Sequence, residues 1–344
     1  MRRLLQYLFK KLITRIANKY AAAPDRKSVF KSLSKLYRLS EKENKTICVK
    51  EINGSAKFII FSDQHKGNGD HADDFRASEI NYINALKYYA ANDFTFINLG
   101  DSEELWKYKP EQVIPKCTEA FKAEAAFQEK DRYIKTFGNH DLLWKNKMDV
   151  DIYLKNNFRL PLPVWEAVLL KVTLNEKLLS VLLTHGHQGD KMSDNNRFST
   201  WMVAHLWTPF QRYLRINVNT PSNDDFLRNK HNRIMYEWSS RGQNLLLITG
   251  HTHQPVFASG RYSNHSSNDF SKADLQNVKP SYFNSGCCCF NDGDITGIEI
   301  ADEFIRLIKW HQEGLTSNKK VLEEKALVEL VKDLADNKEL KIKN

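Results

Sequence analysis

The feature that most constrains this chain is a set of five short polar motifs, each directly after a strand-like apolar run. The motifs join small residues to aspartate, asparagine or histidine, which bind metals through oxygen and nitrogen. In chain order they are Ser62-Asp63-Gln64-His65, Gly100-Asp101, Gly138-Asn139-His140-Asp141, His185-Gly186-His187 and Gly250-His251-Thr252-His253. Any one of them is a weak signal. Together, at five strand exits, they predict one site at the carboxyl ends of the strands.

The apolar runs before these motifs alternate with amphipathic stretches. The runs cover residues 57–62, 94–99, 133–137, 179–184 and 245–249, and helical patterns cover 74–91 and 112–129. This alternation predicts an α/β fold whose sheet is covered by helices on both faces. Further runs at 281–284, 295–300 and 304–310 predict a closing antiparallel meander. We expect a basic arm over 1–50, a catalytic domain over 51–312 and a charged helical tail over 313–344.

The stretch from about residue 190 to 241 carries no strand signal. Helical patterns at 193–214 and 225–239 flank a loop rich in Pro, Asn and Ser, which predicts a helical cap inserted over the sheet. Its aromatic residues either pack the cap on the core or line a pocket for acyl chains, with arginines for a phosphate head. The candidate substrate-binding residues in the cap are Asp194, Asn195, Arg197, Trp201, Arg212 and Arg215.

The net charge of +9 is confined to the first part of the chain. Residues 1–50 hold 14 Lys/Arg and 3 Asp/Glu, a net charge of +11, whereas the remainder holds 37 and 39, a net charge of −2. A nearly neutral body lacks the basic groove expected of a nucleic-acid enzyme. The charge balance therefore disfavours nucleic acid as a partner.

Residues 1–20 form a helical pattern with one apolar stripe and no acidic residue. Such a helix either docks on its own domain or lies in a membrane interface, where each basic residue near anionic lipid adds ~1 kcal/mol. The acid-free charge favours an anionic membrane surface as partner. Lys10 and Lys11 interrupt the apolar core that a signal peptide needs. The six basic residues are Arg2, Arg3, Lys10, Lys11, Arg15 and Lys19.

Cysteine usage points away from disulfides. The five cysteines are odd in number, and three of them are adjacent at 287–289, which favours a reducing compartment. Successive residues of a strand point to opposite faces, so three neighbours in a strand would not converge on one ion. We expect residues 287–289 to be buried strand cysteines.

The ligand types in the five motifs also constrain the metal. Imidazole, carboxylate and amide groups without thiolate suit Mn, Fe, Zn or Co better than Ca or Mg. One ion needs only three or four protein ligands, whereas two ions ~3.5–4 Å apart use more and share a carboxylate, as in phosphoester displacement. We therefore expect two divalent transition-metal ions, with Mn²⁺ as the first candidate and Fe or Zn as alternatives.

The five motifs, in this order, resemble those of the calcineurin-like metallophosphoesterases over about residues 57–310. The resemblance implies a β-sandwich flanked by helices, with two metal ions at the strand ends. It places His140 beside the scissile phosphate, where it stabilises charge or protonates the leaving oxygen, and Asp141 as the residue that orients His140. The implied metal ligands are Asp63, His65 and His253 for the first ion, Asp101 as the bridge, and Asn139, His185 and His251 for the second.

Within this superfamily, three features resemble the UDP-2,3-diacylglucosamine pyrophosphatases. They are the Gly-Asp-x-x-acid-x-Trp pattern at 100–106, the aromatic helical cap, and Gly-His-Thr-His-Gln-Pro at 250–255. That group acts on a lipid A precursor at the inner membrane surface. This chain differs by carrying His140 where the group usually has Arg, and by its N-terminal extension.

Three functions are considered. The first is a membrane-associated phosphodiesterase or pyrophosphatase acting on a lipid- or nucleotide-linked substrate such as UDP-2,3-diacylglucosamine. It implies a cytoplasmic enzyme, peripheral on the inner face of the membrane. The second is a phosphomonoesterase of phosphoproteins or small soluble metabolites, with the arm merely docked. The third, a non-catalytic scaffold, is disfavoured because competent residues occupy every ligand position.

Overall fold

The computed structural model describes residues 24–42, 45–158, 161–174, 177–190, 225–261, 278–314 and 316–335. Within these residues the strands form two seven-stranded sheets. The first sheet has the order β1 (Ile47–Asn53), β6 (Ala167–Leu174), β7 (Lys177–Thr184), β8 (Leu245–Thr249), β11 (Tyr282–Asn284), β9 (Val256–Phe257) and β10 (Gly260–Arg261). The second has the order β14 (Thr316–Ala326), β13 (Phe304–Glu313), β12 (Ile295–Ala301), β2 (Phe58–Phe61), β3 (Thr95–Leu99), β4 (Tyr133–Thr136) and β5 (Val164–Trp165).

The two sheets stack on a shared aliphatic core. Ile60 on β2 and Ile97 on β3 belong to the cluster that also contains the buried side chains of β6, β7 and β8. Their chain neighbours Ile59 and Phe96 point the other way, into a second cluster beneath helices. Because successive strand residues alternate between faces, a strand that is apolar throughout is buried on both sides. The α/β sandwich flanked by helices that the sequence predicts is confirmed.

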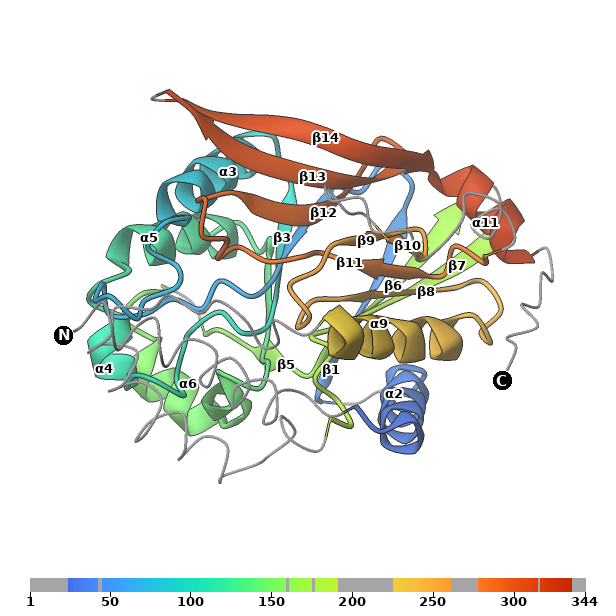
Figure 1. Cartoon of the computed structure of the whole chain (residues 1–344), viewed down its shortest axis with the longest axis horizontal. Helices are drawn as coiled ribbons and strands as arrows, with labels where there is room; N and C mark the ends of the chain where they lie inside the picture. Colours follow the sequence, from blue (N-terminus) through green and yellow to red (C-terminus); the bar gives the residue numbers. More distant parts are fainter. Residues whose placement is uncertain are drawn as a thin grey trace.

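Helices cover the outer face of each sheet (Figure 1). The helices α3 (Glu79–Ala91) and α5 (Thr118–Gln128) pack on the second sheet, and α2 (Arg26–Ser40) and α9 (Asp225–Ser239) pack side by side on the first. Helix α2 begins where the Asp25 carboxylate accepts a hydrogen bond from the Ser28 amide at 3.1 Å. The remaining helices are α4 (Pro110–Val113), η1 (Leu142–Lys145), α6 (Lys147–Tyr153) and α11 (Leu327–Ala335).

The strands that precede the five motifs end at one edge of the sandwich. The predicted runs correspond to β2, β3, β4, β7 and β8, of which the first three are mutually parallel and the last two are parallel to each other. Parallel neighbours end on the same side of a sheet, so the loops that follow them are brought together. The helical patterns at 74–91 and 112–129 correspond to α3 and α5.

The expected helical tail over 313–344 is wrong for its first part, since residues 316–326 form a strand. Instead β14 pairs antiparallel with β13, and α11 follows it. Strand β14 lies at the edge of its sheet and carries three Lys, two Glu and few apolar residues. Edge strands are commonly charged because charge discourages pairing with other chains. A highly charged composition is also typical of an exposed helix, which is why the sequence predicted a helix here.

Two further boundaries differ from expectation. Strand β11 lies in the first sheet, parallel to β8, and β12, β13 and β14 form the antiparallel meander. At the other end of the chain, α2 and β1 pack into the body, so the body includes residues that we had assigned to the arm. In the part of the chain that is described, no helix is long and apolar enough to cross a membrane.

Four buried charged side chains tie the loops after β2 and β3 to strand β4 and helix α5. Lys66 Nζ lies 3.0 Å from Glu103 Oε1 and also pairs with Glu124, and Lys135 Nζ lies 3.0 Å from Glu103 Oε2. Burial alone would raise the pKa of Glu103, but the two lysines lower it to about 2. The neutral donors to the two glutamates are Ser102 Oγ and Trp144 Nε1 for Glu103, and Tyr82 and Tyr133 hydroxyls for Glu124.

Replacing Glu103 with glutamine is expected to lower the free energy of unfolding by about 3–5 kcal/mol, because a buried charge then loses its partner. Urea unfolding followed by circular dichroism measures the effect. The control is Glu119→Gln, which breaks the exposed Lys122 pair on α5 and should leave the unfolding midpoint unchanged. Equal midpoints for the two variants would contradict a structural role for the buried network.

Candidate metal centre

Backbone strain is concentrated in the loops at the sandwich edge. Five candidate ligands adopt the left-handed conformation, which costs a non-glycine residue roughly 1–3 kcal/mol and which persists where the surrounding structure enforces it. Such strain gathers at functional sites because it aims side chains that a relaxed turn would not. The φ angles are 55° for Asp63, 52° for His65, 51° for Asp101, 68° for His251 and 55° for His253.

Two motif glycines are required by close packing of carboxylates against the backbone. A Cβ atom at Gly138 would overlap the Asp101 carboxylate, and one at Gly250 would overlap the Asp63 carboxylate. Each glycine therefore lets an aspartate from another loop reach the centre. The glycines of the motifs have a steric role in the site as well as a role in turns.

The ligands assigned to the first ion converge on one space. His253 Nε2 lies 3.2 Å from His65 Nε2 and 3.2 Å from Asp63 Oδ1. His65 Nε2 in turn lies 3.9 Å from Asp63 Oδ1 and 3.8 Å from Asp101 Oδ2. All four side chains are buried. Two imidazoles and two carboxylates in this arrangement fit one divalent transition-metal ion.

Two of the ligands assigned to the second ion, His185 and His251, meet at Asp101 as well. His185 Nε2 lies 3.1 Å from Asp101 Oδ2, and His251 offers a ring nitrogen within 4.8 Å of both. Asn139 Oδ1, His185 Nε2 and both ring nitrogens of His251 are buried and have no hydrogen-bond partner among the described residues. Buried polar atoms without partners are rare in native proteins. A cation here would satisfy them, so the residues fit a second ion.

The electrostatic environment is also that of a cation site. Burial would lower the pKa of His185, yet the carboxylates of Asp101 and Asp63 raise it to about 9. Burial would raise the pKa of Asp63, yet His253 and His185 lower it to about 2. These opposite shifts show that the pocket strongly favours positive charge beside its two carboxylates.

For three candidate histidine ligands the second ring nitrogen has a hydrogen-bond partner, and for the fourth, His251, the Asp190 carboxylate lies nearby beyond hydrogen-bond distance. Such outer contacts fix the ring and its tautomer in metal sites, and are usually carboxylates or backbone carbonyls. The pairs are His65 Nδ1 with Glu104 Oε2 at 3.2 Å, His185 Nδ1 with Leu99 O at 3.0 Å, His251 Nε2 with Asp190 Oδ2 at 3.8 Å, and His253 Nδ1 with Cys289 Sγ at 3.7 Å.

His140 lies beside the ligands and is held on two sides. Its Nδ1 is 2.8 Å from Glu104 Oε1, and its ring stacks on Trp106 at 4.0 Å between centroids. Trp106 is held in turn by a hydrogen bond from its Nε1 to the carbonyl of Asn139 at 2.7 Å. Burial would lower the pKa of His140, but Glu104 and Asp101 raise it. A histidine with a raised pKa can donate a proton near neutral pH.

The expected role of Asp141 is wrong. Its carboxylate accepts hydrogen bonds from the amides of Gly138 at 2.6 Å and Ser102 at 2.8 Å, and it ties two loops together. Glu104 is the carboxylate that orients His140. Glu104 and Trp106 are the acid and the tryptophan of the Gly-Asp-x-x-acid-x-Trp pattern. The sequence therefore marked both residues, but it did not show that they hold the His140 ring.

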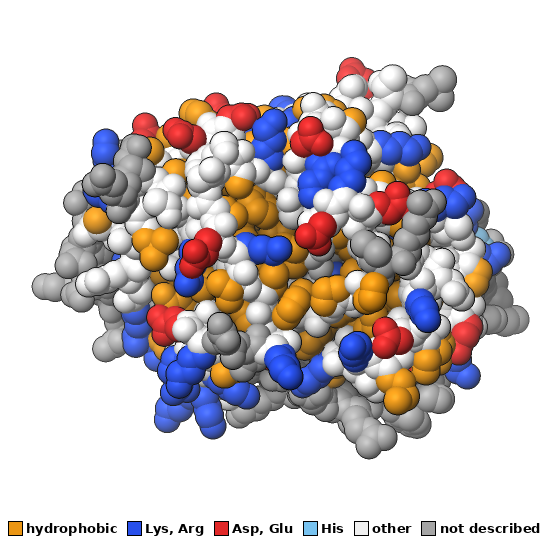
Figure 2. Space-filling view, turned by 180° about the vertical axis from the view of Figure 1, so that it is seen from behind, with side chains coloured by type: hydrophobic (Ala, Val, Ile, Leu, Met, Phe, Trp, Pro, Cys, Tyr) orange, Lys and Arg blue, Asp and Glu red, His pale blue; other side chains and the backbone are white. Residues whose placement is uncertain are grey.

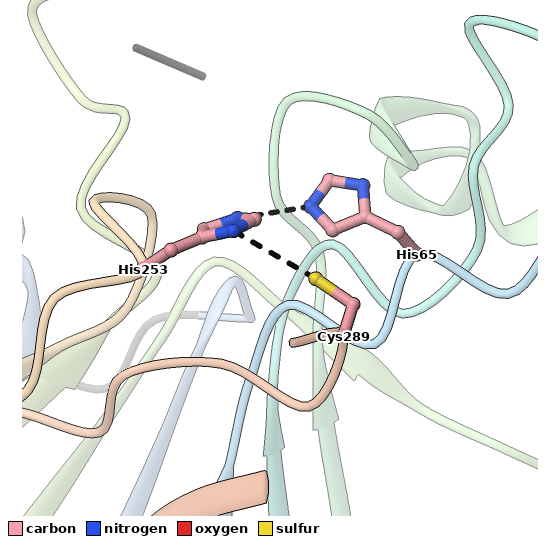
Figure 3. A group of neighbouring side chains, drawn as sticks. All are labelled: His65, His253 and Cys289. Carbon is pink, nitrogen blue, oxygen red and sulfur yellow. Dashed lines mark hydrogen bonds between the residues drawn. The ribbon is translucent and has the colours of Figure 1, made fainter. Parts of the chain in front are cut away.

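The cysteine expectation is correct for burial and wrong for structure. Residues 287–289 are buried, but they lie in the loop after β11 rather than in a strand. The argument from strand geometry therefore does not apply, and Cys289 reaches His253 (Figure 3).

Sequence reasoning missed a second group of residues on the far side of His251. Asp190 and His231 lie there, with their ligand atoms within 4.8 Å of His251. His231 comes from α9 and donates from Nε2 to the carbonyl of Gly186 at 2.9 Å. Nothing in its sequence context marks His231, because α9 carries no motif. The predicted cap residues Asp194, Asn195, Arg197, Trp201, Arg212 and Arg215 lie outside the described residues.

Several solved structures show a weak likeness to this chain. Among solved structures, vacuolar protein sorting 29 from Cryptosporidium parvum is 12% identical over 79% of this chain and 98% of its own, with a TM-score of 0.33. A protein-tyrosine phosphatase from Shewanella is 13% identical over 81% and 84%, with a TM-score of 0.32. A 5'-nucleotidase from Candida albicans is 13% identical over 83% and 55%, with a TM-score of 0.29. Likenesses this weak carry no argument about activity.

A match to a protein-family model is stronger than these structural likenesses. A comparison with curated proteins finds no match. The family model described as calcineurin-like phosphoesterase, however, matches residues 56–255, which is more than half of the chain and includes all five motifs. The chain belongs to the calcineurin-like phosphoesterase family and is a metal-dependent phosphoesterase.

Proposed function

We propose that this phosphoesterase uses two divalent metal ions to hydrolyse a phosphodiester or pyrophosphate bond in a lipid- or nucleotide-linked substrate, such as UDP-2,3-diacylglucosamine, at a membrane surface. The observation that carries the proposal is the placement of His140 beside two adjoining ligand groups that share Asp101. Mn²⁺ is the first candidate ion and Fe or Zn are alternatives, because the ligand groups are imidazole, carboxylate and amide.

Residues of this chain can be assigned to each step of the proposed hydrolysis. When bound, two divalent ions supply a nucleophile at neutral pH and neutralise the phosphoryl oxygens. Glu104 holds His140 through Nδ1, which leaves Nε2 as the nitrogen available to substrate. When the bond between phosphorus and the leaving oxygen breaks, His140 gives that oxygen a proton or stabilises the charge on the phosphoryl group. Trp106 keeps the ring in place.

The point at which the basic arm joins the body supports a membrane-surface enzyme. Pro24, the first described residue, forms a backbone bridge with Asp190, whose carboxylate lies 3.8 Å from His251 Nε2. Residues 1–23 are therefore joined to the body beside the metal centre. A membrane that binds the arm would lie near the site, as a lipid-linked substrate needs. The proposal includes a peripheral position on the inner, cytoplasmic face of the membrane.

The charge distribution of the body favours a lipid- or nucleotide-linked substrate over a nucleic acid. On the face shown in Figure 2, basic and acidic side chains are interspersed around a central group of apolar side chains. A nucleic-acid backbone requires a continuous basic track. The net charge of −2 over residues 51–344 points the same way.

The arm should bind anionic membranes. Wild-type protein is expected to float with vesicles containing phosphatidylglycerol and to remain in solution with pure phosphatidylcholine, because each basic residue near anionic lipid adds ~1 kcal/mol. A variant in which the six basic residues of the arm are glutamine should not float, yet should hydrolyse a soluble substrate at the wild-type rate. Unchanged flotation of that variant would favour the docked arm. The replaced residues are Arg2, Arg3, Lys10, Lys11, Arg15 and Lys19.

The bond specificity is tested with three substrates in the presence of Mn²⁺. Faster hydrolysis of bis-p-nitrophenyl phosphate than of p-nitrophenyl phosphate supports a diester or pyrophosphate bond, and turnover of UDP-2,3-diacylglucosamine identifies the lipid class. The reverse preference would replace the proposal with a phosphomonoesterase of phosphoproteins or soluble metabolites.

A further inference from the structure

One candidate ligand has an unusual neighbour. The outer neighbours of His65, His185 and His251 are oxygen atoms, whereas those of His253 include sulfur atoms: Cys289 Sγ lies 3.7 Å from Nδ1, and Cys287 also interacts with the ring. Cys289 is absent from the five motifs that identify the family. Its contact with the metal centre therefore comes from outside the motifs.

The geometry separates the two ring nitrogens of His253. Nε2 faces Asp63 Oδ1 and His65 Nε2, each at 3.2 Å, so it is the nitrogen directed at the ion position. Nδ1 lies 3.7 Å from Cys289 Sγ, within reach of a hydrogen bond to sulfur (Figure 3). The sulfur thus contacts Nδ1 of His253, and it also lies within 4.8 Å of a ring nitrogen of His65.

The loop that carries Cys289 is fixed to the site. The amide of Cys288 donates to the carbonyl of Asp63 at 3.2 Å, and the amide of Thr296 donates to the carbonyl of Cys287 at 3.0 Å. Cys289 is 1% exposed, so its sulfur is shielded from solvent. The neighbouring thiol of Cys288 lies instead beside the carbonyl of Thr296, at 3.9 Å. Two adjacent buried thiols therefore have different surroundings, and one of them contacts a candidate ligand.

We propose that Cys289 is a positioning residue for His253. Its sulfur accepts a hydrogen bond from Nδ1–H, which holds the ring and keeps Nε2 unprotonated for the ion at the Asp63 side of the centre. Outer partners of this kind change metal affinity about 10–100-fold when they are removed. The inference rests on the two-ion centre of the proposed function. It assigns the thiol to one ion position and not to the other.

The test uses the full-length protein, stripped of metal and titrated with Mn²⁺ by isothermal calorimetry. In Cys289→Ala, one of two binding events should weaken by about 10–100-fold and the other should stay within about twofold. Cys289→Ser should retain most of the affinity, because a hydroxyl oxygen also accepts a hydrogen bond. The matched control, Cys288→Ala, removes a buried thiol from the adjacent position and should bind both ions as the wild type does.

Other outcomes would overturn the inference. If Cys289→Ala binds both ions with wild-type affinity, the thiol does not position His253, although the metal centre stands. If Cys288→Ala weakens binding as much as Cys289→Ala, the effect is one of packing. If the wild type takes up no Mn²⁺, Fe²⁺ or Zn²⁺, the metal centre of the proposed function fails together with this inference. Urea unfolding of each metal-free variant shows whether a loss of affinity reflects a loss of fold.

Discussion

Asp101→Asn is expected to abolish the pairing of two metal ions and to lower phosphodiester hydrolysis by about three orders of magnitude, since metal stabilisation of the transition state contributes several kcal/mol. Asp101 belongs to both candidate ligand groups, that of Asp63 and His65 and that of His185 and His251. Its Oδ2 lies 3.1 Å from His185 Nε2 and 3.8 Å from His65 Nε2. Asparagine keeps the shape of the side chain but removes the charge that two cations would share. Metal content by plasma mass spectrometry and turnover of bis-p-nitrophenyl phosphate are measured together.

The control for this variant is a buried aspartate outside the ligand groups. Asp74 is 8% exposed and pairs with Lys107 at 2.6 Å, and no candidate ligand group includes it. Asp74→Asn should therefore retain the wild-type metal content even if it loses stability. Two tightly bound ions in Asp101→Asn would show that this carboxylate is not shared, and the ligand assignment would need revision.

The candidate site was largely predictable because its ligands are local in sequence. Each ligand follows a strand within a few residues, and the parallel arrangement of those strands then brings distant motifs together. Strand exits and ligand chemistry were enough to select the five motifs, and the resemblance to the calcineurin-like family then assigned Asp63, Asp101 and His251 as ligands. The glycines of the motifs were also recognisable in the sequence. The structure gives their reason, because carboxylates packed against the backbone at Gly138 and Gly250 leave no space for a Cβ atom.

The residues that support the ligands were not predictable in the same way. Asp141 is next to His140 in the sequence, whereas Glu104 comes from a different loop. Only the folded structure shows that Glu104, and not Asp141, contacts the His140 ring. Cys289 and His231 reach the centre from a loop and a helix that carry no motif. Strand β14 was missed because an edge strand and an exposed helix have similar compositions.

His140→Ala is expected to lower turnover by about 10²–10⁴-fold, the usual contribution of a positioned acid or base, while leaving both ions bound. The side chain contacts Glu104 and Trp106, and its link to Asp101 is a backbone hydrogen bond at 2.8 Å that alanine keeps. Metal content and turnover should therefore separate in this variant. Loss of metal from His140→Ala would mean that the ring is a ligand and that the assigned roles are mistaken.

The same variant distinguishes the two roles that His140 can have. A proton donor matters most when the leaving oxygen is a poor leaving group, so the rate loss should be larger for an alkyl phosphodiester than for bis-p-nitrophenyl phosphate. Stabilisation of phosphoryl charge should lower both rates by the same factor. Glu104→Gln provides the matched comparison, because Glu104 contacts His65 as well as His140. It should reduce turnover and also weaken metal binding, whereas His140→Ala reduces turnover alone.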